Sequence, residues 1–183
     1  MGRRNSGKSS VERVLEQIGF KRSISYSTRK DREVKESREL LTKTEDTLEA
    51  EMEKEYNIVD KKTFMQLVQK GHIIEYEEYN GNLYGTPRPY GSTKFVATVC
   101  LKGFKALKKM YGEQVIGVYL KCDEDVSLSR ESDIEKAEFN KLSNQYRETL
   151  KQMEDEADIV IDSNKNINLV IADILKVLRS LNF

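Results

Sequence analysis

Residues 1–9, Met-Gly-Arg-Arg-Asn-Ser-Gly-Lys-Ser, decide how the rest of this chain is interpreted. They contain the spacing Gly-x-x-x-x-Gly-Lys-Ser, in which Gly2 and Gly7 enclose four residues and Lys8 and Ser9 close the motif. Glycines let the backbone curl into a row of N–H donors for phosphate, the lysine reaches the outer phosphates, and the hydroxyl binds Mg²⁺. A helix that begins here adds its N-terminal dipole to the anion site. The stretch therefore predicts a phosphate-binding loop.

Size and composition set the limits for everything that follows. With 183 residues the chain forms one domain of ordinary size. Its 31 basic and 31 acidic residues cancel, which gives no reason to expect a nucleic-acid or membrane partner. Cys100 and Cys122 are too few for a disulfide framework, and neither stands at metal-ligand spacing to His72. No apolar run approaches the ~18 residues that a membrane span needs, and no leader pattern is present, so we expect a cytoplasmic protein.

Hydrophobic patterning along the chain alternates between strand and helix. A charged, weakly hydrophobic excursion at 33–55 interrupts the alternation, and Asn80-Gly81 predicts a hairpin turn. The alternation favours an α/β fold of three layers with a parallel sheet. Together with the phosphate-loop motif, it predicts a sheet of the P-loop NTPase type. The expected strands are 20–26, 56–59, 72–76, 94–100, 114–120 and 158–162, and the expected helices are 11–18, 60–70, 101–111, 123–131, 133–157 and 166–181.

A second basic cluster, Arg29 and Arg32, follows the first expected strand. In open α/β sheets, ligands bind outside the carboxyl ends of strands, so these arginines could clamp a second anion. A solvated charged turn is the alternative reading of the same residues.

Four motifs in succession carry a resemblance to a known family. They are Gly2-x-x-x-x-Gly7-Lys8-Ser9, Ser23-x-Ser25-x-Ser27-Thr28-Arg29-x-x-Arg32, Ile73-Ile74-Glu75 and Gly81-Asn82-Leu83-Tyr84-Gly85-Thr86. In this order, over nearly the whole chain, they resemble the guanylate kinase family of nucleoside monophosphate kinases. The resemblance implies transfer of the terminal phosphoryl group of ATP, with Mg²⁺, to GMP or dGMP. It also implies one domain, with a core at about 1–28 and 88–183, a monophosphate-binding insertion at about 29–87 and a helical lid at about 123–145.

The resemblance also assigns roles to individual residues. For the ATP site it implies Gly2, Asn5, Ser6, Gly7, Lys8, Ser9 and Ser10, with Ser9 as the Mg²⁺ ligand. For the acceptor it implies Ser25, Arg29, Arg32, Tyr56 and Tyr84 around the phosphate, and Glu75 with Thr86 at the guanine base. Lys8, Arg29 and Arg130 would stabilise charge during transfer. The residue types alone also allow Glu75 to be a solvent-facing strand residue, and Tyr56 and Tyr84 to be half-buried sheet residues.

The chain departs from the family pattern at several positions. Thr98 and Cys100 stand where the family has two aspartates, one that reads guanine and one near the metal, and Lys141 stands where the lid has an arginine. These changes leave open a kinase with another base preference, or a binding module that has lost catalysis. Only Met1 precedes Gly2, so we expect either a natural start about eight to ten residues upstream or a gapped sheet that binds ATP poorly. The expected partners are small nucleotides, and the expected assembly is a monomer or homodimer.

Overall fold

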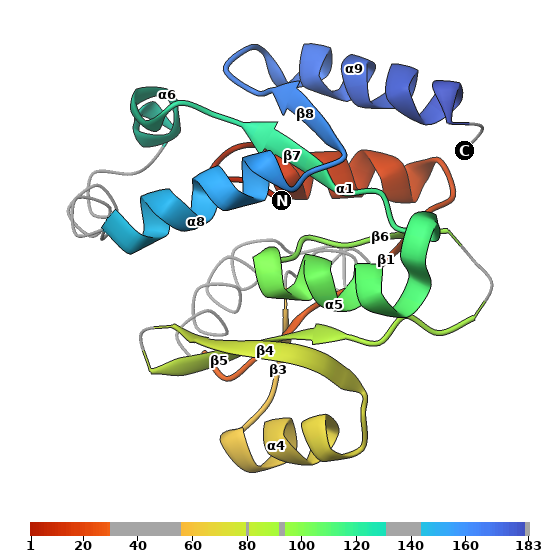
Figure 1. The fold of residues 1–183 in the computed structure, drawn as a ribbon, viewed down its shortest axis with the longest axis vertical. Coiled ribbons are helices and arrows are strands. Elements are labelled where there is room, and N and C mark those ends of the chain that lie inside the picture. The colour runs from red at the N-terminus through yellow and green to blue at the C-terminus, as the bar shows by residue number, and fades with distance from the viewer. Residues whose placement is uncertain (30–55, 80, 92–93, 131–143, 182–183) are drawn as a thin grey trace, which may run out of the picture. The chain divides into compact units, whose positions relative to one another are not determined.

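A computed structural model of the chain describes residues 1–29, 56–79, 81–91, 94–130 and 144–181 (Figure 1). The chain divides into two compact units. The first comprises Met1–Phe20 and Thr98–Phe183, and the second comprises Lys21–Ala97. Both ends of the insertion predicted at 29–87 fall inside the second unit. Among the described residues no helix is long and apolar enough to span a membrane.

The first unit is built on two parallel strands, β7 and β8, whose register aligns Leu120 with Ile161. Gly2 forms a parallel bridge to Leu120, so the start of the phosphate loop lies beside β7. The Met1 amino group donates to Val118 O at 2.7 Å, and burial lowers its pKa to about 5. The elements of this unit are α1 (Lys8–Gln17), α5 (Leu101–Tyr111), the 3-10 turn η1 (Gly112–Gln114), β7 (Val118–Lys121), α6 (Glu124–Ser129), α8 (Asn144–Asp155), β8 (Ile159–Asp162) and α9 (Ile167–Ser180).

Side chains of β7 alternate between two apolar layers. Tyr119 packs in a buried cluster with residues of α5 and α8, and burial raises its pKa to about 12. Leu120 and Ile161 point the other way along the paired strands and are buried, as are the inner residues of α1 and α9, which contact each other. The strands of this unit therefore lie between two pairs of helices, which is the three-layer arrangement expected from the sequence.

The second unit contains a four-stranded sheet in the order β3-β2-β5-β4 and a separate parallel pair, β1-β6. In the four-stranded sheet β2 pairs in parallel with β3 and antiparallel with β5, and β4 and β5 form the hairpin predicted by Asn80-Gly81. The elements are β1 (Lys21–Arg22), β2 (Tyr26–Ser27), β3 (Asn57–Ile58), α4 (Lys61–Gln69), β4 (Ile73–Tyr79), β5 (Asn82–Pro87) and β6 (Phe95–Val96).

Helix α4 supplies the core of the second unit. Phe64 is fully buried against Ile73 and Leu83, and Gly85 of β5 makes room for it, because a Cβ there would lie 2.8 Å from the Phe64 ring. The helix begins as predicted, since the Asp60 carboxylate accepts from Thr63 N at 2.8 Å. The apolar face of α4 therefore packs on β4 and β5, and these three elements form the core of the second unit.

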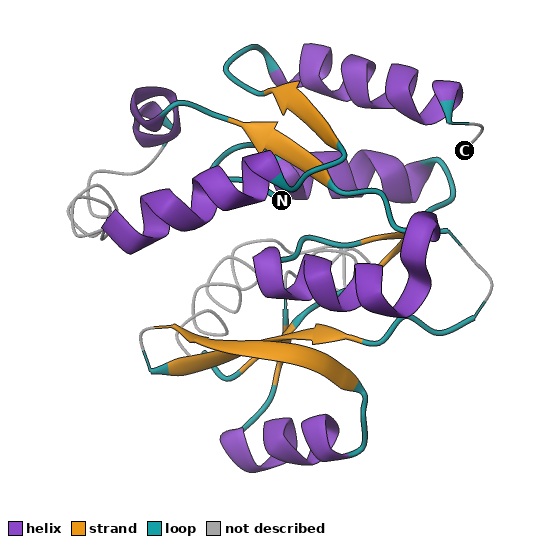
Figure 2. Ribbon diagram, in the orientation of Figure 1, coloured by secondary structure: helices purple, strands orange, loops and turns teal. Residues whose placement is uncertain are grey.

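Helices and strands alternate along the described chain, which confirms the α/β class (Figure 2). The predicted strand bounds were wrong in four places. The strand expected at 72–76 runs three residues further, as Ile73–Tyr79. The strand expected at 20–26 is two short strands in different sheets, the strand expected at 94–100 pairs only at Phe95–Val96, and the strand expected at 114–120 is shifted to Val118–Lys121 behind a 3-10 turn. The excursion at 33–55, and the part of the expected helix 133–157 before residue 144, lie outside the described residues.

Candidate functional site

The phosphate loop has the backbone geometry that its glycines predict. Gly7 has φ 90° and stands at the N-cap of α1, where no side chain caps the helix, and Asn5 also has a positive φ, 54°. Alternation between right- and left-handed conformations makes successive N–H groups converge on one concave surface. The first turn of α1 has no acidic residue, so nothing on it offsets the positive end of the helix dipole. The loop therefore has the backbone geometry expected of an anion site.

A pocket of about 330 Å³ opens over the start of α1. Five of the seven predicted loop residues line it: Asn5, Gly7, Lys8, Ser9 and Ser10. The other two, Gly2 and Ser6, do not, and Ser6 is fully buried. Gly2 lies against the neighbouring strand, because a Cβ there would come within 2.7 Å of Leu120 O. Gly2 and Ser6 therefore shape the loop from behind the pocket.

Two cations of the described chain border this pocket, Lys8 and Arg130. The Lys8 ammonium donates to Arg3 O at 2.5 Å, within the curl of the loop. The Arg130 guanidinium donates to Asn5 O at 2.9 Å and to Ser163 O at 3.1 Å. Arg130 thus joins the phosphate loop to the segment between β8 and α9 as well as adding positive charge to the pocket.

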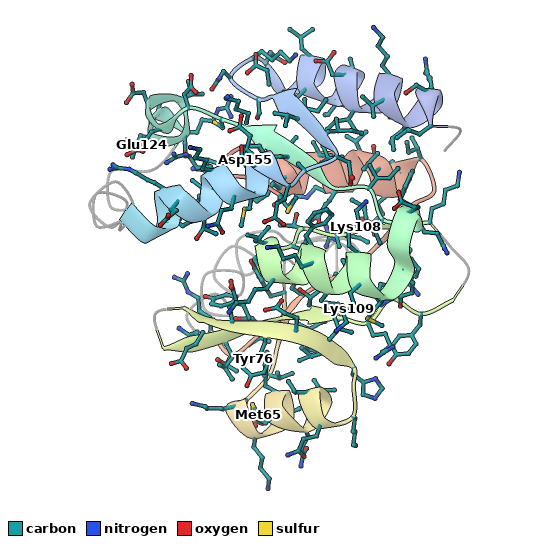
Figure 3. The ribbon with its side chains drawn as sticks, in the orientation of Figure 1. Met65, Tyr76, Lys108, Lys109, Glu124 and Asp155 are labelled. Atoms are coloured by element: carbon teal, nitrogen blue, oxygen red, sulfur yellow. The ribbon has the colours of Figure 1, made fainter. Side chains whose placement is uncertain are left out.

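An ion-pair chain ties the loop to two helices of the same unit. Glu124, at the start of α6 (Figure 3), accepts from Arg147 Nη2 at 3.1 Å and from Arg3 Nη1 at 3.2 Å. The hydrogen bond from Arg147, aided by Arg3, lowers the pKa of Glu124, although partial burial of the carboxylate opposes this shift.

Burial raises the pKa of the Cys122 thiol, although Arg130 Nη1 lies 3.8 Å from its sulfur. Cys122 is therefore a thiol at neutral pH.

Four of the residues expected to bind the acceptor phosphate lie on or beside the four-stranded sheet of the second unit. The rings of Tyr56 and Tyr84 meet edge to face with centroids 5.8 Å apart. Ser25 lies next to β2, where its carbonyl accepts from Asn57 N, and Arg29 follows β2, where its N–H donates to Ser27 Oγ. Arg32 lies outside the described residues. The sheet register therefore gathers four of the five expected phosphate-binding residues within one sheet and its flanks.

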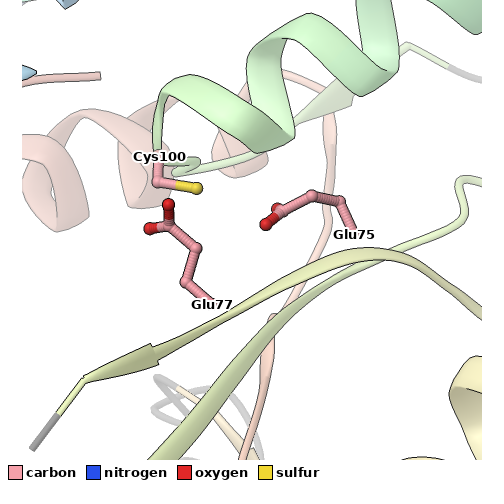
Figure 4. A group of neighbouring side chains, drawn as sticks. All are labelled: Glu75, Glu77 and Cys100. Atoms are coloured by element: carbon pink, nitrogen blue, oxygen red, sulfur yellow. The ribbon is translucent and has the colours of Figure 1, made fainter.

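The two residues expected to read the base face each other across the hairpin. Glu75 of β4 pairs with Thr86 of β5, and Thr86 Oγ1 donates to Glu75 Oε2 at 3.5 Å. Glu75 and Glu77 extend from the same side of β4, as expected for alternate strand residues (Figure 4). This face presents carboxylate oxygens next to a hydroxyl, which are acceptors suited to the N1–H and amino donors of guanine.

Of the three positions that depart from the family pattern, Cys100 has a structural role in the described chain. Cys100 stands at the N-cap of α5, where its sulfur accepts from Gly103 N at 3.4 Å (Figure 4). The position normally taken by an oxygen-bearing cap is thus filled by a weaker acceptor. Thr98 lies between β6 and α5 in no regular element, and Lys141 is outside the described residues.

Sequence reasoning missed three residues of the pocket region. Ile167, the first residue of α9, lines the pocket and lies so close to the loop that a Cβ on Gly7 would be 2.8 Å from its Cδ1. Ser127 Oγ donates to Arg4 O at 2.8 Å, and Ser163 Oγ donates to Ser6 O at 2.5 Å. A serine in a helix and a serine after a strand match no motif, so no sequence signal marked them.

Comparisons with known proteins agree on one family. No protein-family model matches the chain. The guanylate kinase of Oleidesulfovibrio alaskensis is 36% identical over 84 residues, which cover 45% of this chain and 34% of that protein. The guanylate kinase of Prochlorococcus marinus is 27% identical over 137 residues, which cover 69% of this chain and 73% of that protein. The first match thus spans about a third of its relative's length, and the second nearly three quarters.

The fold has a counterpart among solved structures. The crystal structure of guanylate kinase from Anaplasma phagocytophilum matches with a TM-score of 0.60 and 22% identity, over 94% of this chain and 81% of that one. This match shows the fold. The two sequence matches are to guanylate kinases, the family that the order of motifs in this chain resembles.

Proposed function

We propose that this protein, whose sequence and fold support the guanylate kinase family, is a nucleoside monophosphate kinase. It would transfer the terminal phosphoryl group of ATP to a phosphate oxygen of GMP or dGMP, giving ADP and the nucleoside diphosphate. Such transfer needs little covalent chemistry from the protein, so positioning and charge neutralisation would supply most of the catalysis.

The observation that carries the proposal is the pocket at the start of α1. It combines loop N–H groups, an uncapped helix N-terminus, the Lys8 ammonium and the Arg130 guanidinium around about 330 Å³. All of these stabilise negative charge, and none of the described lining residues is acidic. ATP would place its phosphates on the loop, where Lys8 would neutralise the outer ones and Arg130 would add charge at the edge.

Mg²⁺ fits this pocket as a phosphate-bound ion. Ser9 is exposed in the lining and its hydroxyl is an oxygen ligand of the kind Mg²⁺ accepts. Mg²⁺ usually keeps several waters and binds through one or two protein ligands plus substrate phosphates, so a single hydroxyl is enough for a starting site. Ser9 would hold the ion, and the ion would neutralise charge between the phosphates.

The acceptor would bind on the second unit. Ser25, Arg29, Arg32, Tyr56 and Tyr84 would hold its phosphate, and the Glu75 and Thr86 pair would accept from guanine. Arg29 would also offset charge on the transferred group. The facing of Glu75 and Thr86 across β4 and β5 supports this assignment.

The direct test is a coupled ADP-release assay with ATP, Mg²⁺ and each common nucleoside monophosphate. We expect turnover with GMP or dGMP above that with the other acceptors. Glu75→Gln should raise the KM for GMP, because an amide presents donors where the base needs acceptors. Glu78→Gln is the matched control, because Glu78 follows Glu77 on the same strand, is exposed, and by strand alternation lies on the opposite face from Glu75 and Glu77. Absence of turnover with any acceptor would contradict the proposal.

A second candidate is a binding module of the same fold without catalysis. Cys100 and Thr98, which replace two aspartates of the family pattern, favour it, because each substitution removes a carboxylate. Calorimetry separates the two candidates. Binding of GMP without binding of ATP or turnover would favour the module, whereas binding of both nucleotides with turnover would favour the kinase.

A further inference from the structure

Four consecutive carbonyl groups of the phosphate loop each accept a hydrogen bond from a side chain. Arg3 O accepts from Lys8 Nζ, and Asn5 O accepts from Arg130 Nη1. Between and after them, Arg4 O accepts from Ser127 Oγ at 2.8 Å and Ser6 O accepts from Ser163 Oγ at 2.5 Å. Four consecutive carbonyls are thus fixed, two of them by serines that the proposed function does not use.

Both serines are placed by distant parts of the chain. Ser127 lies on α6 and is fully buried, and Ser163 follows β8 and is 1% exposed. The Ser163 N–H donates to Lys121 O at 2.7 Å, which attaches its backbone to the end of β7. A buried hydroxyl costs free energy unless it is hydrogen-bonded, so each serine has a strong preference for its loop carbonyl.

The orientation of a carbonyl fixes the orientation of the next N–H group. The peptide unit is planar and trans, so the C=O of one residue and the N–H of the next point in opposite directions. Holding Arg4 O on Ser127 therefore turns the Asn5 N–H away from α6. Holding Ser6 O on Ser163 turns the Gly7 N–H away from Ser163 and the end of β8. Asn5 and Gly7 both line the pocket, whereas Ser6, between them, is buried.

We infer that Ser127 and Ser163 are positioning residues of the phosphate loop, which hold the N–H groups of Asn5 and Gly7 toward a bound polyphosphate. The inference rests on the proposed function for the identity of the ligand. Preorganised donors stabilise charge without having to reorient when it arrives. The serines contribute by fixing that orientation from behind, and neither serine lines the pocket.

The test compares Ser127→Ala and Ser163→Ala with Ser129→Ala. Ser129 lies two residues further along α6, is exposed, and bonds only locally to Val126 O among the described contacts. We expect the dissociation constant of ATP, measured by calorimetry, to rise about tenfold in the first two variants, as for loss of a buried hydrogen bond. It should stay at the wild-type value in the control. Adenosine, which has no phosphates, should bind all four proteins alike.

A second readout does not depend on nucleotide binding. In the NMR spectrum of the free protein, Ser127→Ala should shift the amide signal of Asn5 most, and Ser163→Ala that of Gly7. Ser127→Cys, which keeps the volume but donates weakly, should behave like Ser127→Ala if packing is not the cause. If the wild-type protein binds no ATP, the proposed function fails, and the amide signals still decide the positioning role. Unchanged Asn5 and Gly7 signals, or ATP affinities equal to that of Ser129→Ala, would overturn the inference.

Discussion

Lys8 is the first residue of α1 and lines the pocket, and its ammonium donates a hydrogen bond to the Arg3 carbonyl oxygen. Lys8→Met keeps much of the side-chain length and removes the charge. We expect turnover in the ADP-release assay to fall about 10²- to 10³-fold, as for loss of one preorganised donor to developing charge.

Lys109→Met is the control for this change. Lys109 is exposed in the last turn of α5 (Figure 3) and does not line the pocket. It should keep the wild-type turnover. Equal turnover in the Lys8 and Lys109 variants would show that the ammonium of Lys8 takes no part in the reaction.

For individual residues, the sequence predicts local contacts but not contacts between residues that lie far apart along the chain. That Asn5 and the residues from Gly7 to Ser10 line one pocket was predictable, because the motif is local and each residue type has a chemical reason. Ser127 and Ser163 act on Arg4 and Ser6 across 123 and 157 positions. Only the folded chain brings such residues together, so no spacing rule could have identified them.

Among the elements, the packing of α4 against β5 gives a test of the second unit. Gly85→Ala would place a Cβ 2.8 Å from the Phe64 ring and 2.7 Å from Ile73 Cγ2. Overpacking of a closed core typically costs about 1–3 kcal/mol. We expect a loss of that size in the free energy of unfolding, measured by urea denaturation.

The double variant Gly85→Ala with Phe64→Leu identifies the cause. If the alanine clashes with the ring, the smaller side chain relieves it, and the double variant should lose less stability than the sum of the single losses. Strictly additive losses would place the effect of Gly85→Ala somewhere other than the Phe64 contact.

The elements themselves were predicted unevenly, for a physical reason. Helices α4, α5 and α9 matched their predicted ranges closely, since helical periodicity and caps such as Asp60 are local. The run at 94–100 has the side chains of a buried strand, yet only Phe95 and Val96 form ladder pairs, with Lys21 and Arg22. An apolar pattern in the sequence indicates that a segment is buried. The length of a strand depends instead on how many of its residues pair with the neighbouring strand.

At the scale of the whole molecule, the ionisation of Asp158 makes the free energy of unfolding depend on pH. Its carboxylate accepts from Gly117 N at 2.6 Å and from Lys108 Nζ at 3.0 Å, and although burial raises its pKa, these bonds leave the pKa below the ordinary value. Since the folded-state pKa is the lower one, the stabilisation is complete above the unfolded pKa of about 3.9. It is lost as the pH falls from there through the folded pKa.

Asp158→Asn should therefore melt at a lower temperature than the wild-type protein at pH 7. The difference should shrink as the pH is lowered below about 4, because the wild-type carboxylate is then protonated too. Thermal melts followed by circular dichroism between neutral and acidic pH measure it. A melting-temperature difference that stays constant over the whole range would mean that the charge of Asp158 does not contribute.

The charge of the pocket lining also bears on how fast a nucleotide arrives. Lys8 and Arg130 stand at the pocket, and no carboxylate is among its described lining residues, in a chain whose total charge is zero. The attraction for a polyanion is therefore local, and mobile ions screen it over about 8–10 Å at physiological ionic strength. Capture of ATP would thus be accelerated only over the last part of its approach, and added salt would slow association more than it would speed release.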